Sequence, residues 1–314
     1  MTAPAAPIQL ESLTTVVSRT PLQNVIRRLF RHRSAQVGMI ILGFLTILAI
    51  FAPLFAPFDP IKPLREVKRR SAPCIHVFGC PADQPQHFFG IDSNQRDLLS
   101  RIIYGARLSL EIGVATVTFA IVIGVILGAV AGFIGGWTDN IIMRLMDVLL
   151  AFPGLLLSIA IVAVLGPGLI NALLAIAFVS IPVYARIVRA SVLQVKEQDF
   201  VSASRALGAS PLGILVGHVL PNAITPIIVQ ATLGIASAIL DAAALSFLGL
   251  GAAPPTPEWG LMLGEERNSL FNAPHLVFIP GIAIMLTVLA FNLIGDGMRD
   301  ALDPRQVNVS KKFS

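Results

Sequence analysis

Six long apolar segments constrain the fold of this chain more than any other feature of its sequence. Each is long enough for an α-helix to cross the hydrocarbon core of a membrane, which takes about 20 residues. Charged residues make up only 13% of the 314 residues, about half the share found in soluble domains. The segments lie at about 36–57, 109–133, 141–165, 169–188, 223–250 and 276–296. We therefore predict an all-α integral membrane protein with six transmembrane helices.

The first apolar segment is predicted to stay in the mature protein. It follows a tail of about 35 residues and is longer than the apolar core of a signal peptide. The six segments divide the chain into parts. These are a tail at 1–35, the first transmembrane helix at 36–57, a long loop at 58–108, a core of five helices at 109–300 that includes an inner loop at 189–221, and a second tail at 301–314.

The Lys and Arg residues predict which loops face the cytoplasm, because cytoplasmic loops carry an excess of both. With the N-terminus inside, 14 of the 23 basic residues fall in the tails and inner loops, and one falls in the outer loop 251–275. The other eight fall in the outer loop 58–108, against the rule, although long loops follow it less strictly. We expect both termini to be cytoplasmic.

The long loop 58–108 holds the two cysteines of the chain, Cys74 and Cys80. An oxidising compartment outside the membrane would allow a disulfide between them, whereas an inverted topology would leave two free thiols. The sequence leaves both alternatives open. His76 lies between them, but no fourth ligand lies near in sequence, so we expect no metal site.

The end of the same loop has the pattern of an amphipathic helix. From Asp97 onward, apolar residues recur at helical spacing and alternate with Ser100, Arg101 and Arg107. We expect a separate interfacial helix that lies on the membrane before the second span.

Four acidic residues lie within or at the edges of the predicted spans, where unpaired charges are costly. They are Glu111, Asp147, Asp241 and Asp296. Arg107 lies one turn before Glu111 and Arg144 three residues before Asp147, spacings that predict structural ion pairs. Asp241 has no basic residue on its turn of the helix. It is either a hydrogen-bonded packing residue or part of a translocation path, for which Asp147 is the second candidate.

Small residues and prolines predict how the spans pack and bend. Gly124, Gly128 and Gly132 are spaced four apart, which lets another helix approach closely. Pro153 is expected to break the third span, and Pro226 lies at the start of the fifth.

Motifs for intrinsic catalysis were not found in the sequence. It has no Gly-Lys pair and hence no P-loop, so ATP is not expected to bind by that route. H-E-x-x-H and G-x-S-x-G are also missing. We expect a conduit without enzymatic activity or a cofactor of its own.

One polar stretch interrupts the apolar sequence, "DFVSASRALGASPLGILVGHVLPNA" at residues 199–223. It is longer than the connection of two neighbouring helices requires, and it has helical periodicity. It is either a solvated surface helix or an element that docks on a partner.

The residues of this stretch carry a family resemblance. Ser202-Ala203-Ser204, Gly208 and Leu220-Pro221 resemble the E-A-A-x-x-x-G…I-x-L-P loop of ABC importer permeases, with Ser202 in place of Glu and His218 in place of Ile. The stretches "GIDSNQRDLLSRIIYGARLSL", "DNIIMRLMDVLLAFPGLLL", "ILDAAALSFLGLGAAPPTPEWG" and "LTVLAFNLIGDGMRDALDPR" resemble the second membrane subunit of dipeptide and oligopeptide ABC importers, closest to the dipeptide branch. Asn94-Gln95 depart from that pattern, which commonly has Gly before the Arg. The resemblance covers about residues 20–305.

The resemblance implies a type I ABC importer permease fold and an alternating-access permease for short peptides, dipeptides first. Relatives of similar architecture carry oligopeptides, nickel chelates, glutathione or haem. It also implies partners: a second, homologous permease subunit, two cytoplasmic ATPase subunits that bind ATP and Mg²⁺, and an extracytoplasmic peptide-binding protein. No nucleic acid is implied.

The resemblance makes the stretch at 199–211 a coupling helix, a rigid rod in a groove of one ATPase. Its motion would swing the spans from inward-open to outward-open. The coupling residues would be Ser202, Ala203, Ser204, Arg205, Ala206, Gly208 and Ala209.

Two other classes of protein were considered. An ion-coupled secondary transporter would use Asp241 and Asp147 as ion sites, and it typically shows an inverted repeat, which we do not detect between the two halves of the sequence. A membrane-anchored receptor or assembly factor does not account for six spans with acidic residues among them.

Overall fold

The computed structural model describes residues 28–81 and 85–302, and in these ranges it is helical with two isolated β-bridges and no strands. Most of the two predicted tails, residues 1–27 and 303–314, lies outside the described residues. The α-helices are α2 (Arg33–Ile50), α3 (Ala52–Phe55), α4 (Leu98–Ile134), α5 (Gly136–Leu150), α6 (Gly154–Leu165), α7 (Leu169–Lys196), α8 (Asp199–Ala206), α9 (Pro211–Ile214), α10 (Leu220–Ala223), α11 (Thr225–Phe247), α12 (Trp259–Glu266) and α13 (His275–Leu302).

Five helices of the described chain are long and apolar enough to cross a membrane, namely α2, α4, α7, α11 and α13. The third predicted span, 141–165, is not one straight helix. It consists of α5 and α6, which meet at an angle of 90° and count as a sixth span only if they are taken together. The break lies at Pro153, which precedes the first residue of α6, so the predicted effect of this proline is confirmed.

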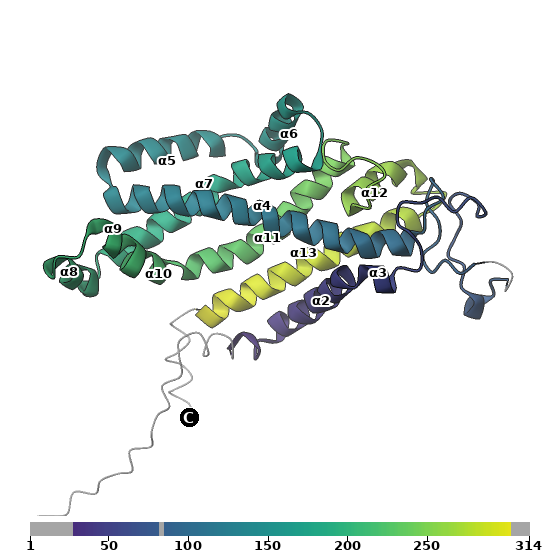
Figure 1. Ribbon diagram of the computed structural model, residues 1–314, viewed down its shortest axis with the longest axis horizontal. Coiled ribbons are helices and arrows are strands. Elements are labelled where there is room, and N and C mark those ends of the chain that lie inside the picture. Colours follow the sequence, from purple (N-terminus) through teal and green to yellow (C-terminus); the bar gives the residue numbers. More distant parts are fainter. Residues whose placement is uncertain (1–27, 82–84, 303–314) are drawn as a thin grey trace, which may run out of the picture.

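The long helix α4 runs side by side with α7 through the middle of the bundle (Figure 1). A Cβ atom on Gly124 would lie 2.6 Å from Cβ of Tyr184, and one on Gly128 would overlap the carbonyl oxygen of Ala185. The glycines thus let the two helix backbones come close, as the four-residue spacing predicted.

Helices α2, α11 and α13 lie on one side of this pair, and α5 and α6 lie on the other (Figure 1). α13 lies between α2 and α11, and α12 packs on both α11 and α13 (Figure 1). Gly38 of α2 faces the backbone of α13, where an added Cβ atom would lie 2.7 Å from the carbonyl oxygen of Ala290.

The expected interfacial helix before the second span is wrong. α4 continues without a break for 37 residues, from Leu98 to Ile134. Asp97 caps its N-terminus by accepting a hydrogen bond from the backbone N–H of Ser100. Ser100 and Arg101, two of the polar residues that suggested a membrane surface, are buried against other segments of the chain, whereas Arg107 is exposed.

Candidate functional site

The polar stretch between α7 and α11 consists of several short helices, not of one rod. α8 has eight residues and ends at Ala206. Gly208 follows with φ +83°, a conformation that residues with a Cβ rarely adopt. Ser210 then caps α9 by accepting a hydrogen bond from the N–H of Gly213. The expected rod over 199–211 is therefore wrong, because the backbone turns at Gly208. We call residues 199–223 the coupling segment.

One side of the coupling segment is anchored to the bundle. Val201, Ile214 and Val219 are at most 2% exposed and pack in one cluster with Val188 and Val192 of α7. Burial of such side chains stabilises by about 1.5–3 kcal/mol each, which fixes the segment relative to the spans.

The other side of the coupling segment is open. The predicted coupling residues are exposed, except that Ser204 is half-buried and donates a hydrogen bond to the carbonyl of Phe200. Among them stands Leu207, which is 89% exposed although it is apolar. No sequence pattern distinguishes Leu207, because its neighbours in the motif are small. Leu207 thus extends into solvent from among the small residues of the motif.

The C-terminal part of the coupling segment contains a π-helix, Leu215–Val219. His218, the residue that departs from the family pattern, is exposed within it. Its carbonyl oxygen accepts a hydrogen bond from the Asn222 side chain, which joins the π-helix to α10.

At the opposite end of the molecule, five charged side chains form what we call the charge cluster: Asp92, Arg96, Arg101, Glu265 and Glu266. Arg96 donates from Nε to Asp92 at 2.7 Å and from Nη2 to Glu265 at 2.8 Å. Glu266 accepts from the backbone N–H of Ser93 at 2.7 Å. The cluster joins the long loop, the start of α4 and the end of α12.

Arg101 is the most deeply buried member of the charge cluster, with its side chain 1% exposed. Its guanidinium donates hydrogen bonds to the backbone carbonyls of Pro60, Pro255 and Thr256, at 3.1, 3.2 and 3.4 Å. Its Nη2 atom also lies 3.4 Å from Oε2 of Glu265. The sequence pattern predicted Arg101 on the polar side of an interfacial helix and gave no sign of this role.

Beside the charge cluster, Glu258 caps α12. Its carboxylate accepts hydrogen bonds from the N–H groups of Gly260 and Leu261, at 2.9 and 2.7 Å. Burial raises the pKa of the Glu258 carboxyl, and these two hydrogen bonds only partly oppose that shift.

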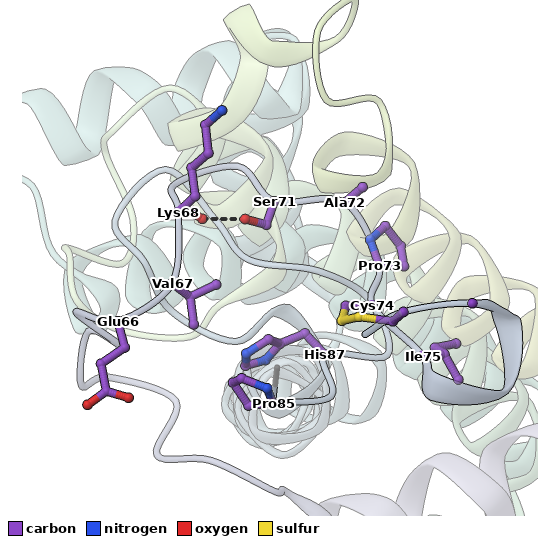
Figure 2. A pocket seen from close by; sticks show the side chains of 12 residues that line it. Glu66, Val67, Lys68, Ser71, Ala72, Pro73, Cys74, Ile75, Pro85 and His87 are labelled. Atoms are coloured by element: carbon purple, nitrogen blue, oxygen red, sulfur yellow. Dashed lines mark hydrogen bonds between the residues drawn. A yellow bond between two sulfur atoms is a disulfide. The ribbon is translucent and has the colours of Figure 1, made fainter. Parts of the chain in front are cut away.

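The structure joins Cys74 and Cys80 in a disulfide, the first of the two alternatives that the sequence left open. Figure 2 shows this bond at the wall of a cavity of about 670 Å³, close to His87 and Pro85. The backbones of Cys74 and His87 pair in a short bridge. Nδ1 of His87 in turn lies 3.0 Å from Oδ1 of Asp97, which caps α4. The disulfide loop is thus connected to the N-terminus of α4.

The two candidate path residues have different surroundings. Asp147 forms an ion pair at 2.5 Å with Arg186 of α7 and not with Arg144. The predicted ion pair is therefore confirmed, but the predicted partner is wrong. The predicted pair of Glu111 and Arg107 is present at 3.0 Å. Asp241 is half-buried and has no hydrogen bond or ion pair within the described ranges. The structure alone does not bring Asp241 and Asp147 together as one site.

Two family models match the chain. The first, binding-protein-dependent transport system inner membrane component, matches residues 124–308, more than half of the chain. This chain belongs to that family. The second, the N-terminal transmembrane domain of oligopeptide transport permease C, matches residues 20–73. The chain is thus a multi-pass inner membrane protein and a permease subunit of an ABC transporter, a type of subunit that works with a second permease and with ATPase subunits.

Curated relatives match this permease over nearly its whole length. The dipeptide transport system permease protein DppC of Alkalihalophilus pseudofirmus is 46% identical over 94% of this chain and 93% of its own. The glutathione transport system permease protein GsiD of Escherichia coli is 47% identical over 91% of each chain. The di/tripeptide transport system permease protein DppC of Pseudomonas aeruginosa is 46% identical over 94% of this chain and 96% of its own.

A solved structure supports the fold of the permease. A chain of the MetNI methionine ABC transporter, in an inward-facing conformation, superposes with a TM-score of 0.55 at 19% identity. The match covers 66% of this chain and 98% of the other. The predicted type I ABC importer permease fold is therefore confirmed.

Proposed function

We propose that this permease moves short peptides, dipeptides first, across the cytoplasmic membrane by alternating access, driven by ATP hydrolysis in partner subunits. The observation that carries the proposal is the coupling segment, which is fixed to the spans on one side and exposes Arg205 and Leu207 on the other. The names of the relatives, two of which are permeases for dipeptides or di- and tripeptides, support the substrate class.

The coupling segment would transmit the motion of the ATPase subunits to the spans. One of two ATPase subunits, which would bind ATP and Mg²⁺, would hold Leu207 in an apolar groove and face Arg205 with acidic side chains. When the ATPases close on ATP, the segment would move as a unit with α7, because Val201 and Ile214 are buried in one cluster with Val188 and Val192 of that helix. A rigid-body motion of this kind changes the access of the path from one side to the other.

The proposed function also implies which side of the membrane each part of the chain faces. The coupling segment and both termini would face the cytoplasm, a topology supported by the 14 basic residues on that side. The long loop with the disulfide and the charge cluster would face outward, where a peptide-binding protein would deliver the substrate. The residues that this protein would meet first are those of the long loop.

The experiment uses the permease expressed with its second permease subunit and its ATPases. Gly208→Trp places a bulky side chain at an exposed position with φ +83°, and Gly79→Trp is the matched control, since Gly79 is also open and has φ +96°. We expect Gly208→Trp to reduce co-purification of the ATPases and ATP hydrolysis at least tenfold, and Gly79→Trp to leave both unchanged.

Two results would contradict the proposed function. One is a Gly208→Trp complex that assembles, hydrolyses ATP and transports like the original. The other is transport by the permease alone in liposomes driven by an ion gradient, which would favour a secondary transporter. The substrate is identified separately, by mass spectrometry of the ligand carried by the co-purified binding protein, which separates dipeptides from glutathione and from longer peptides.

A further inference from the structure

Three polar side chains follow one another along one side of α11, and we call them the polar stripe: Gln230, Ser237 and Asp241. At about 100° per residue they fall within an arc of about 40° on the helix surface. Helices α4, α7, α12 and α13 also pack on α11, and α7 lies next to the stripe at Gly234. The side of the stripe is incompletely covered, because Ser237 and the neighbouring Leu240 are exposed and Gln230 and Asp241 are half-buried.

The members of the polar stripe have almost no partners in the described chain. The carboxylate of Asp241 and the amide of Gln230 make no hydrogen bond or ion pair there, and the Ser237 hydroxyl makes only a 3.4 Å contact with the carbonyl of its own helix at Leu233. Two other acidic residues of the spans are paired, Glu111 with Arg107 and Asp147 with Arg186. Asp296 has no ion pair in the described ranges, but it is exposed near the end of α13. An unpaired carboxylate against lipid is costly, so the stripe must face a polar surface or a polar ligand.

A fourth polar group lies beside the stripe. The hydroxyl of Tyr184, on α7, lies where a side chain on Gly234 of α11 would stand, so the lack of a side chain at Gly234 makes room for it. Gly234 lies between Gln230 and Ser237 in sequence and about 20° from Asp241 around the helix. Tyr184 is only 2% exposed, so its hydroxyl is held against α11 beside the stripe and is not itself open to a ligand.

We propose that the polar stripe binds the N-terminal ammonium group and the backbone amides of a peptide during its passage. This inference rests on the proposed function and adds the group that is recognised. The carboxylate of Asp241 carries the one unpaired negative charge of the stripe and pairs with the ammonium. Gln230 and Ser237 supply donors and acceptors that suit peptide N–H and C=O groups.

The dimensions of the polar stripe agree with a short peptide. Along the axis of α11, Ser237 lies about 6 Å from Asp241, and Gln230 about 16 Å from it. An extended peptide advances about 3.3–3.6 Å per residue. The stripe is therefore long enough for a dipeptide between Asp241 and Ser237 and for four or five residues as far as Gln230. The competing occupant of the stripe is a basic side chain of the second permease subunit.

The test uses the complete complex, with ATPases and binding protein, in proteoliposomes with a radiolabelled dipeptide. A hydrogen bond to a charged group contributes about 1.5–3 kcal/mol, so we expect Asp241→Asn to lower kcat/KM of transport at least about tenfold. Asp241→Glu, which keeps the carboxylate, should retain most of the original kcat/KM of transport. The control Glu111→Gln removes an exposed acid that is paired with Arg107 and should leave transport unchanged.

A photo-crosslinking residue at Leu240, which is 47% exposed beside Asp241, gives a direct readout. We expect it to capture the labelled dipeptide during turnover, and Asp241→Asn to reduce the adduct. The same residue at Met285 of α13, 56% exposed, is the control and should capture none.

The outcomes separate this inference from the proposed function. No ATP-dependent transport by the original complex would refute the proposed function. Normal transport by both the original and Asp241→Asn would refute only the role of the stripe. Loss of the second permease subunit on purification of Asp241→Asn, with crosslinks to that subunit alone, would assign the stripe to the subunit interface and also overturn the inference.

Discussion

Replacement of Arg101 by Met tests whether the charge cluster stabilises the permease. Methionine is unbranched and of similar length, so it fills most of the space and removes the charge and the donors. The three carbonyls of Pro60, Pro255 and Thr256 then lose a donor, and Glu265 loses one of its two cations. Loss of one partner from a buried charged pair costs about 3–5 kcal/mol.

The matched control is Arg107→Met, on the same helix. The side chain of Arg107 is 58% exposed and pairs with Glu111 four residues later, an arrangement that contributes about 0.3–0.5 kcal/mol. At about 2–4 °C per kcal/mol for domains of 150–250 residues, we expect Arg101→Met to lower the unfolding temperature by about 10 °C, and Arg107→Met by no more than about 2 °C.

Intrinsic fluorescence follows this unfolding directly. The chain has two tryptophans, and Trp259 is fully buried next to the charge cluster, with its indole N–H donating to the carbonyl of Ile102 at 3.1 Å. Trp137 is 82% exposed and contributes little change. The measurement is a thermal melt in detergent at constant pH. Equal unfolding temperatures for Arg101→Met and Arg107→Met would refute the claim that the buried network stabilises this end of the molecule.

Three further predictions concern packing, pH and redox state. Gly128→Leu should lower the yield of folded permease and its unfolding temperature, because a Cβ there overlaps the backbone of α7, whereas Gly43→Leu should not, since nothing lies within 4 Å of it. Since the folded pKa of Glu258 is raised, its contribution to stability is present below its ordinary pKa of 4.5 and is lost as pH rises through the raised value. Glu258→Gln should therefore flatten the fall of the unfolding temperature over that pH range, and an unchanged slope would contradict the raised pKa of Glu258. A thiol-alkylating reagent should modify Cys74 and Cys80 only after reduction, as judged by mass spectrometry; modification without reduction would contradict the disulfide.

The spans could be predicted from the sequence because lipid requires long apolar helices and because proline breaks them at fixed places. The break at Pro153 and the close approach at Gly128 both follow from local residue types. The bend angle of 90° does not, because it depends on how α6 packs against α7.

The charge cluster could not be predicted, because its partners are far apart in sequence. Arg101 reaches Glu265, a residue 164 positions later, and in the sequence its charge resembles that of a surface residue. Asp147 shows the same limit: Arg144 is the nearest cation in sequence, yet Arg186 of α7 is the partner in space. The exposure of Leu207 could not be predicted, because a single leucine forms no periodic pattern in the sequence. It depends on the end of α8 and on the backbone turn at Gly208.

The unbroken length of α4 has a mechanical consequence. At 1.5 Å per residue its 37 residues extend about 55 Å, well beyond a hydrocarbon core of about 30 Å. Near one end Arg101 holds the helix in the charge cluster, and near the other Lys196 donates a hydrogen bond to the carbonyl of Gly132. A straight lever of this length that tilts by about 10° around its midpoint moves each end by about 5 Å, in opposite directions. A push on the cytoplasmic face would thus reach the outer face as an equal and opposite displacement, without any change in the helix itself.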